Sequence, residues 1–302
     1  MHQLFQRASS HWARYDVYEL KKAKDGMQYV TPAPKATPII YDPLEDAEAL
    51  VIDMLNIGML SMNRAKEEAV REAVLSFVHK YGLLGFMTAL PTTPDFVEYE
   101  AVYLPKNHFI KEETLSTDEY LSYFFPFEKL DFDKTGKESV WNIGSDKGMM
   151  ALALTFMDEP QAMSMSLQRE YAERYDWLVT QFKDMAFTFC SSFLYYQDYD
   201  HIDETTRNLY RQGMAAFGGI APSYHIELRE TPVIVWDFHS LLRCMQMMFS
   251  FVLTDEKNPL RSCKHCTKAF VAAHPNTLFC SPQCKNQHNV YKSRKRQKEP
   301  KE

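Results

Sequence analysis

The chain has 302 residues, of which 45% are hydrophobic, 25% charged and 14% aromatic. This composition excludes a wholly disordered chain and predicts a globular protein with a sizeable core. No apolar run approaches the ~20 residues that cross a bilayer, and the first residues lack the apolar stretch and cleavage site of a secretory signal. We therefore expect a cytoplasmic protein whose cysteines stay reduced.

The net charge of −6 conceals an uneven distribution along the chain. Residues 261–302 carry ten Lys and Arg against two Asp and Glu, a balance of +8. The residues before them carry 24 against 38, a balance of −14. A basic tail on an acidic body is typical of a polyanion-binding arm, or of a tail that folds back on its own body.

The first predicted elements are an extended segment and two helices. Residues 29–43 hold four prolines and predict an extended connector. Apolar residues then recur at helical spacing over residues 43–60 and 64–82. The first helix places on one face Ala47, Leu50, Val51, Met54, Leu55 and Gly58. The second places on one face Ala69, Val70, Ala73, Val74, Phe77 and Val78, and Gly82 ends it.

The rest of the body is also predicted to be mostly helical. Expected elements are a short helix at 116–125, one long helix or two stacked helices at 161–198, a helix at 203–218 capped by Asp203, and a helix at 238–259. Alternating and β-branched residues at 223–238 predict a pair of strands. The fold class is mainly α (α+β), with a body over residues 1–259, a sub-boundary near 126–160, and a small module over 260–302.

Four of the six cysteines lie in that module, as Cys263-x2-Cys266 and Cys280-x3-Cys284 with thirteen residues between the pairs. Two close pairs at this separation are what one tetrahedral Zn²⁺ requires. The sequences KAFVA and TLF between the pairs predict a hairpin that turns at AHPN. A tight turn at the first cysteine pair, followed by a hairpin and then by a helix that carries a ligand, predicts a treble-clef finger with one structural zinc.

The second pair also predicts the start of a helix. Ser281 stands where an N-cap belongs and Pro282 at the first helical position. A helix N-terminus stabilises the negative charge of a four-thiolate site. One of the nearby histidines could replace a cysteine, namely His265, His274 or His288, although four thiols suffice. A site filled by four protein ligands has no open position for water, so the metal is expected to be structural.

The body offers no recognisable catalytic motif. Phosphate-binding glycine loops, Gly-x-Ser-x-Gly and His-Glu-x-x-His are all missing from the sequence. Cys190 and Cys244 lie in apolar helical runs and are interpreted as buried small side chains. The triplet at 225–227 (HIE) matches part of the zinc-deaminase pattern, but it sits in a predicted strand and leaves two cysteines unexplained. We expect that the protein is not an enzyme.

The helix that begins at Pro282 continues into the basic tail. Residues that form one stripe along it are Lys285, Asn289, Lys292 and Arg296, and Arg294, Lys295 and Lys298 widen the basic side. Cys284, Gln287 and Tyr291 lie on another face, toward the finger. Such a stripe can enter the major groove of double-stranded DNA. The alternative is that these basic residues only complement the helix dipole and keep the tail soluble.

The motif resembles the C-terminal zinc finger of bacterial CGNR-type proteins. Shared elements are Arg261 before the first cysteine, Phe270 after the second, Phe279-Cys280-Ser281, Cys284-x-Asn286 and the basic helix. The residues after Cys284 and the pair spacings differ, so the resemblance points to a bacterial family of related architecture. It covers about the last 70 residues. In that family the finger follows a helical ABATE domain and is regarded as a DNA-binding module of transcriptional regulators.

These observations lead to two main functional hypotheses, and an enzyme with its active site in the aromatic body is a third alternative. The first is a DNA-binding transcriptional regulator whose N-terminal body senses a small molecule or binds a protein partner. The second is a structural or protein-interaction zinc module that binds no nucleic acid. An exposed basic face on the last helix would favour the first hypothesis, and a basic face packed on the acidic body would favour the second.

Overall fold

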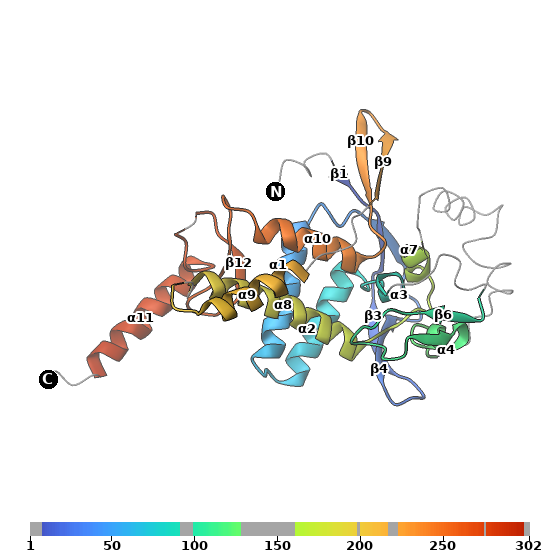
Figure 1. Cartoon of the computed structure of the whole chain (residues 1–302), viewed down its shortest axis with the longest axis horizontal. Helices are drawn as coiled ribbons and strands as arrows, with labels where there is room; N and C mark the ends of the chain where they lie inside the picture. The colour runs from blue at the N-terminus through green and yellow to red at the C-terminus, as the bar shows by residue number, and fades with distance from the viewer. Residues whose placement is uncertain are drawn as a thin grey trace.

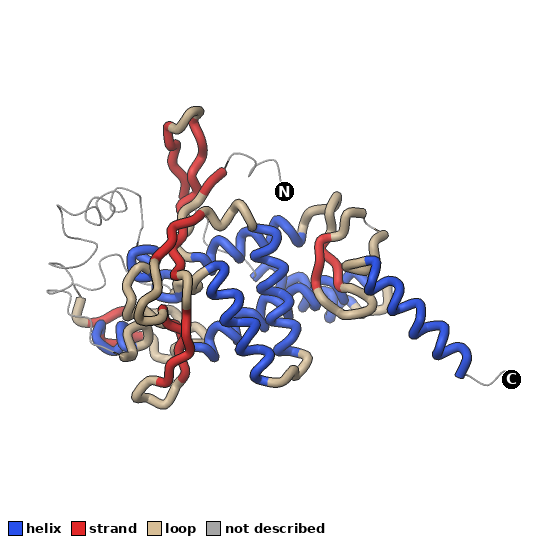
Figure 2. The backbone as a smooth tube through the Cα atoms, turned by 180° about the vertical axis from the view of Figure 1, so that it is seen from behind, coloured by secondary structure: helices blue, strands red, loops and turns tan. Residues whose placement is uncertain are grey.

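A computed structural model describes residues 8–90, 99–127, 161–197, 200–216, 223–274 and 276–298. The boundary predicted near residues 126–160 lies outside these ranges from residue 128 onward. Helices occupy the middle of the molecule, most strands lie to one side of them, and the last helix projects from the opposite end (Figures 1 and 2). A membrane span would need more apolar length than any helix in the described ranges provides.

The described part of the chain mixes helices with several small sheets. The helices are α1 (Ala47–Met62), α2 (Glu67–Tyr81), α3 (Phe86–Ala89), α4 (Thr117–Ser122), α7 (Gln161–Ser166), α8 (Tyr175–Gln197), α9 (Glu204–Ala216), α10 (Leu241–Leu253) and α11 (Pro282–Lys298). The strands are β1 (Ala8–Ser9), β2 (Trp12–Tyr15), β3 (Tyr18–Lys22), β4 (Gln28–Pro32), β5 (Pro38–Tyr41), β6 (Ala101–Tyr103), β7 (Thr114–Ser116), β8 (Glu173–Arg174), β9 (Ser223–Leu228), β10 (Pro232–Asp237), β11 (Leu260–Ser262) and β12 (Ala269–Val271). The sheets have the orders β1-β10-β9, β2-β5, β3-β4-β8, β6-β7 and β11-β12. The fold is α+β, with more strands than the sequence predicted.

The connector predicted at residues 29–43 is extended, but it is part of two sheets. β4 pairs with β3 and with β8, and β5 pairs with β2. Pro32 and Pro38 lie at the ends of their strands, where the missing backbone N–H does not interrupt a ladder. Because Tyr29 and Val30 of β4 are buried, the segment is part of the core.

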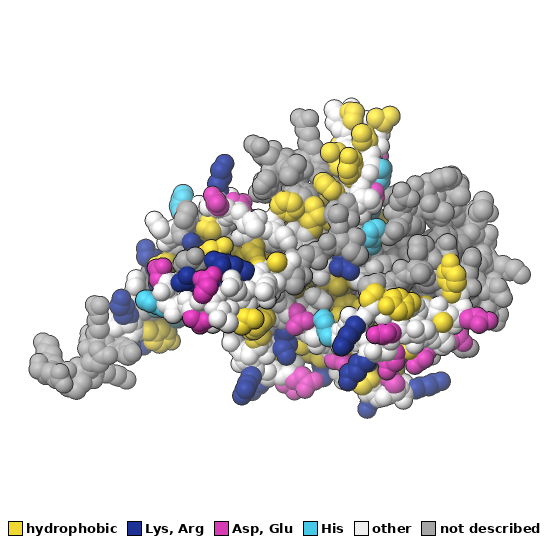
Figure 3. Space-filling view, in the orientation of Figure 1, with side chains coloured by type: hydrophobic (Ala, Val, Ile, Leu, Met, Phe, Trp, Pro, Cys, Tyr) yellow, Lys and Arg dark blue, Asp and Glu magenta, His cyan; other side chains and the backbone are white. Residues whose placement is uncertain are grey.

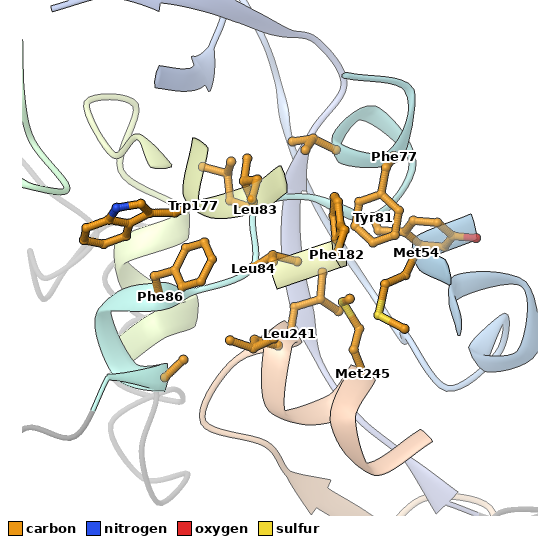
Figure 4. Packing of buried hydrophobic residues seen from close by; sticks show 14 of the residues in the cluster. Met54, Phe77, Tyr81, Leu83, Leu84, Phe86, Trp177, Phe182, Leu241 and Met245 are labelled. Atoms are coloured by element: carbon orange, nitrogen blue, oxygen red, sulfur yellow. The ribbon is translucent and has the colours of Figure 1, made fainter. Parts of the chain in front are cut away.

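Helix α1 confirms its predicted amphipathic face, and α2 confirms most of its own, although Ala69 is exposed and Ala73 is half-buried. The whole predicted stripe of α1, from Ala47 to Gly58, is buried. In α2 the buried positions include Val70, Val74 and Phe77. Gly82 ends α2 at a φ of 88°, which a side chain rarely adopts. Phe77, Tyr81, Leu84, Phe182 and Met245 belong to the core that joins α1, α2, α8 and α10 (Figure 4).

The region 161–198 forms two helices separated by a turn and β8. Glu173 of β8 is 1% exposed. Its carboxylate accepts backbone hydrogen bonds from Leu84 (2.7 Å), Gly85 (2.6 Å) and Phe86 (2.9 Å) and one from the Tyr171 hydroxyl (2.8 Å). Burial raises the pKa of this carboxyl group, and these hydrogen bonds oppose that shift. Glu173 therefore fixes the turn between α2 and α3 to the start of α8.

Gly58 allows α1 and α8 to approach closely. A Cβ atom at this position would lie 2.0 Å from the Phe182 carbonyl oxygen and 2.6 Å from the Ala186 Cβ. We expect Gly58→Ala to lower the free energy of unfolding by about 2 kcal/mol, because overpacking of about 1–3 kcal/mol or more exceeds the gain in helix propensity of about 1 kcal/mol. Urea denaturation measures the change.

A matched glycine variant provides the control for this prediction. Gly213 in α9 has no atom within 4 Å of the position that a Cβ would take. Gly213→Ala should therefore leave stability unchanged or raise it by up to about 1 kcal/mol. Equal midpoints for Gly58→Ala and the native chain would contradict the close contact between α1 and α8.

Candidate metal centre and basic helix

A tight turn between β11 and β12 carries the first cysteine pair. The two strands pair antiparallel, from Leu260 with Val271 to Ser262 with Ala269. The backbone N–H of Cys263 donates to Lys268 (2.9 Å), and that of Thr267 donates to Cys263 (2.9 Å). Thr267 has a φ of 62°, an uncommon left-handed conformation for a β-branched residue. The turn thus brings the thiols of Cys263 and Cys266 close to each other.

All four predicted cysteines meet at this turn. The sulfur atoms of Cys263, Cys266, Cys280 and Cys284 lie within 4.8 Å of one another. The Sγ–Sγ distances are 3.6 Å from Cys266 to Cys280 and 3.5 Å from Cys280 to Cys284. A tetrahedral ion with metal–sulfur bonds of about 2.3 Å separates its ligands by about 3.8 Å. The cluster therefore fits one metal ion, and these thiols are free rather than joined in disulfides.

The thiols influence one another's ionisation. Burial raises the pKa of Cys263, but backbone N–H groups, chiefly those of Cys266 and Cys280, lower it to about 6. Burial and hydrogen bonds with the neighbouring thiols raise the pKa of Cys280 to about 12, and burial also raises that of Cys266. Four thiolates this close repel one another, so full deprotonation requires a cation among them.

Helix α11 begins at the second pair, as predicted. The Ser281 hydroxyl accepts a hydrogen bond from the Cys284 backbone N–H (3.2 Å), and Pro282 is the first helical residue. The helix therefore brings Cys284 to the cluster within its first turn. Its positive end faces the sulfur atoms, where it favours negative charge.

The hairpin predicted between the pairs is wrong. β12 does form within KAFVA, but it pairs with β11 on the other side of the first cysteine pair. Residues 277–279 are not a strand, although the Leu278 carbonyl accepts a hydrogen bond from the Lys264 backbone N–H (3.0 Å). The tight turn at Cys263 and Cys266 places β11 beside β12, so β11 is the strand that pairs with β12.

The histidines of the module fasten α11 to the cysteine turn. The His265 ring contacts the Gln287 side chain at 2.9 Å and stacks on Tyr291 with ring centroids 5.8 Å apart. The His288 ring lies 5.1 Å from Phe279. The predicted inner face of the helix is therefore confirmed at Gln287 and Tyr291. The metal-compatible group contains no histidine among the described residues.

The module is docked on the body through Asn56 of α1. The Asn56 side chain accepts a hydrogen bond from the Ala269 backbone N–H (2.8 Å) and donates one to its carbonyl (3.3 Å). Leu260 and Ala269 belong to the main core. Sequence patterns do not predict this contact, because an isolated Asn in a helix carries no signal for a partner 213 residues away.

The basic residues of α11 face solvent. Lys285, Asn289, Lys292 and Arg294 are exposed, and the helix extends away from the body (Figures 1 and 2). Lys295 and Arg296 belong to the same helix, and their side chains lie outside the described part of the chain. The whole of α11 contains no Asp or Glu.

The other candidate residues of the sequence lie apart from this cluster. Cys244 is buried in α10, and Cys190 of α8 is half-buried against the core. Burial raises the pKa of both thiols. His225 lies on β9, where its Nδ1 contacts the Asp237 carboxylate at 3.0 Å. The interpretation as a buried small side chain is confirmed for Cys244, whereas Cys190 is only partly buried. His225 lies on a different element from all of the cysteines.

Comparison of the chain with protein-family models, with curated proteins and with solved structures finds no match.

Proposed function

We propose that residues 260–302 form a zinc-bound treble-clef module whose basic helix binds double-stranded DNA, on a body of residues 1–259 that acts as its sensory or interaction domain. The observation that carries the proposal is α11 itself. It is fixed at its N-terminus by the cysteine cluster, it projects from the body, and it exposes Lys285, Lys292 and Arg294 without a neighbouring acidic residue in the helix.

Zinc is the proposed ion because four thiolates in tetrahedral spacing are its usual structural ligand set. Cys263, Cys266, Cys280 and Cys284 would hold it. The ion would stabilise a module that has few core residues of its own. Because four protein ligands fill the site, the proposal gives the metal no catalytic role. We further propose a reducing compartment such as the cytoplasm, because thiolate ligands must stay reduced to hold the ion.

The test is salt-dependent DNA binding by the zinc-loaded chain. Fluorescence anisotropy with a labelled duplex should show an affinity that falls steeply between about 50 and 200 mM salt. Replacing Lys285, Lys292 and Arg294 by Ala should weaken binding at least about tenfold. It should also reduce the slope of log K against log salt by up to about 3, because each lost phosphate contact contributes about 0.9.

The control removes the same charge from the body. Lys22, Lys24 and Lys106 are exposed, and their triple Ala variant should keep the native affinity and slope. If the zinc-loaded chain shows no salt-dependent binding, or if the two triple variants behave alike, the DNA-binding function is rejected. Equal zinc content in all three proteins separates this outcome from a damaged module.

A second candidate function is a structural or protein-interaction zinc module without a nucleic-acid ligand. It is favoured by the docking of β12 on α1 through Asn56 and by the place of Leu260 and Ala269 in the main core. In that case zinc would hold the module against the body. The DNA-binding test distinguishes the two, since only the first candidate predicts an effect specific to α11.

A cavity beside the module supports the sensory part of the proposal. It has a volume of about 670 Å³ and is lined by residues of α8, α9 and the end of α10, among them Tyr195, Tyr210 and Arg211. A second cavity of about 470 Å³ shares Tyr196 with it and reaches Lys264 and Leu278 in the module. These volumes suit small molecules, and a ligand there would contact the body and the module together.

The resemblance of the cysteine motif to the CGNR-type finger supports the same function. The resemblance rests on the motif and on the helix that leads into it. It extends the proposal to a bacterial transcriptional regulator with a related architecture, in which the body would take the place of the ABATE domain.

A further inference from the structure

The β9–β10 hairpin stands away from the body and carries an apolar face. The register sets Tyr224 opposite Trp236, Ile226 opposite Ile234 and Leu228 opposite Pro232, so these six side chains share one side of the sheet. Tyr224, Ile226 and Leu228 are 62%, 65% and 82% exposed. Figure 3 shows the hydrophobic side chains gathered on this projection. Contiguous apolar surface of this kind marks an interaction site.

The same hairpin presents an open edge. β9 is the outer strand of the order β1-β10-β9, and no described strand pairs with its other side. Natural edge strands are usually protected by Lys, Pro or a bulge. The sequence of β9, SYHIEL, contains neither Lys nor Pro, and its pairing with β10 runs without a bulge. Its one acidic residue, Glu227, accepts a hydrogen bond from Arg229 of the same chain (2.7 Å). Its backbone is therefore available to a further strand.

The sequence of β9 is complementary to itself. In an antiparallel pair centred on Ile226, Tyr224 faces Leu228 of the second copy on the apolar side. On the other side, His225 faces Glu227 of the second copy. His225 contacts Asp237 through Nδ1, so Nε2 is the nitrogen that can meet that carboxylate. Large apolar cross-strand pairs and hydrogen-bonded polar pairs stabilise a sheet.

Other registers are less favourable. A shift of one residue places apolar side chains opposite polar ones. A pair centred on His225 sets that residue opposite its own copy and loses the contact between the ring and Glu227. A pair centred on Glu227 sets two carboxylates directly opposite each other, which is destabilising. Only the pair centred on Ile226 satisfies both faces of the strand.

We propose that β9 pairs antiparallel with β9 of a second copy of this chain, with Ile226 opposite Ile226, to form one continuous sheet across a two-fold axis. Such an interface is isologous, because each copy contributes the same strand. It is also small, so we expect a dissociation constant in the micromolar range. The inference uses neither the metal nor the nucleic-acid function.

The first test is sedimentation velocity of the full chain between about 1 and 100 μM, which spans micromolar affinity. The native chain should shift from monomer to dimer over this range. Ile226→Lys should weaken dimerisation at least about tenfold, since it places two like charges opposite each other. The matched control is Leu209→Lys on α9, where the native side chain is 64% exposed, and it should dimerise like the native chain.

The second test reads the register. In Ile226→Cys the two thiols would lie across the two-fold axis at a Cα–Cα separation of about 4.5–5.5 Å, within disulfide range. Mild oxidation should give a 226–226 disulfide that peptide mass spectrometry separates from those of native cysteines. Tyr224→Cys should not, because its own copy lies about 14 Å along the strand.

Three results would overturn the proposal. They are a chain that stays monomeric over the whole range, a dimer that Ile226→Lys leaves intact, and a 224–224 disulfide that forms as readily as the 226–226 one. Binding of an unrelated protein to the hairpin of a monomeric chain would assign the surface to another partner and counts as the first of these. Native circular dichroism and zinc content confirm that each variant is folded.

Discussion

Cys263→Ser is expected to abolish metal binding and to unfold the module. Cys263 is the most buried of the four cysteines, at 1% exposed, and it contacts the Cys280 backbone N–H at 3.4 Å. Structural zinc contributes about 10–16 kcal/mol to small modules of this kind, so their fold depends on a complete ligand set. Elemental analysis should find about one zinc per native chain and well under half of that in the variant.

Hydrogen exchange measures which parts of the module lose structure in Cys263→Ser. Backbone amides of β12 and of the start of α11 should lose protection in the variant, because the sulfur cluster joins the turn that precedes β12 to the first turn of α11. The control is Cys190→Ser, which changes a cysteine outside the cluster and should keep full zinc content. Zinc retained by Cys263→Ser, or missing from the native chain purified without chelator, would reject the metal assignment.

Glu173→Ala is expected to lower the free energy of unfolding by about 3–5 kcal/mol. The variant leaves three buried N–H donors and the Tyr171 hydroxyl without an acceptor. Each orphaned buried group costs about 1–3 kcal/mol, and partial relaxation or water entry reduces the sum. Urea denaturation should show a lower midpoint at an unchanged slope.

Two further variants define the cause. Glu170→Ala removes an exposed carboxylate three residues earlier and should change stability by no more than about 0.5 kcal/mol. Glu173→Gln keeps one carbonyl oxygen, but its amide group would face the Leu84 N–H, so the loss should be intermediate. If Glu173→Ala and Glu170→Ala unfold at the same midpoint, the carboxylate does not hold the turn.

Local patterns predicted the local elements well. The apolar stripe of α1 was visible because a helix repeats every 3.6 residues and one face is buried. Local signals also predicted the pair β9–β10, from alternating and β-branched residues. The cap at Asp203, which accepts a hydrogen bond from the Thr206 backbone N–H (2.9 Å), was predicted from its place before the helix. The start of α11 followed from Ser281 and Pro282, whose backbone preferences are independent of the rest of the chain.

Features that depend on distant residues could not be predicted. The proline-rich segment became β4 and β5 because β3, β8 and β2 supply partners, and propensity alone does not show them. The break in the region 161–198 depends on hydrogen bonds that the Glu173 carboxylate accepts from backbone N–H groups 87 to 89 positions earlier in the chain. In the module, spacing identified the four cysteines, but it could not show which strand β12 would choose.

The positions of the hairpin and of α11 determine how far apart the two copies of α11 would lie in the proposed dimer. The β9–β10 hairpin and α11 lie on opposite sides of the central helices (Figures 1 and 2). In the proposed dimer the two hairpins meet, so the two basic helices point outward at the far ends of the assembly. Regulators that read adjacent half-sites hold their helices about one turn of DNA apart. Together with the proposed DNA binding, this arrangement would instead let each end of the dimer bind a separate stretch of duplex, with the intervening DNA in a loop.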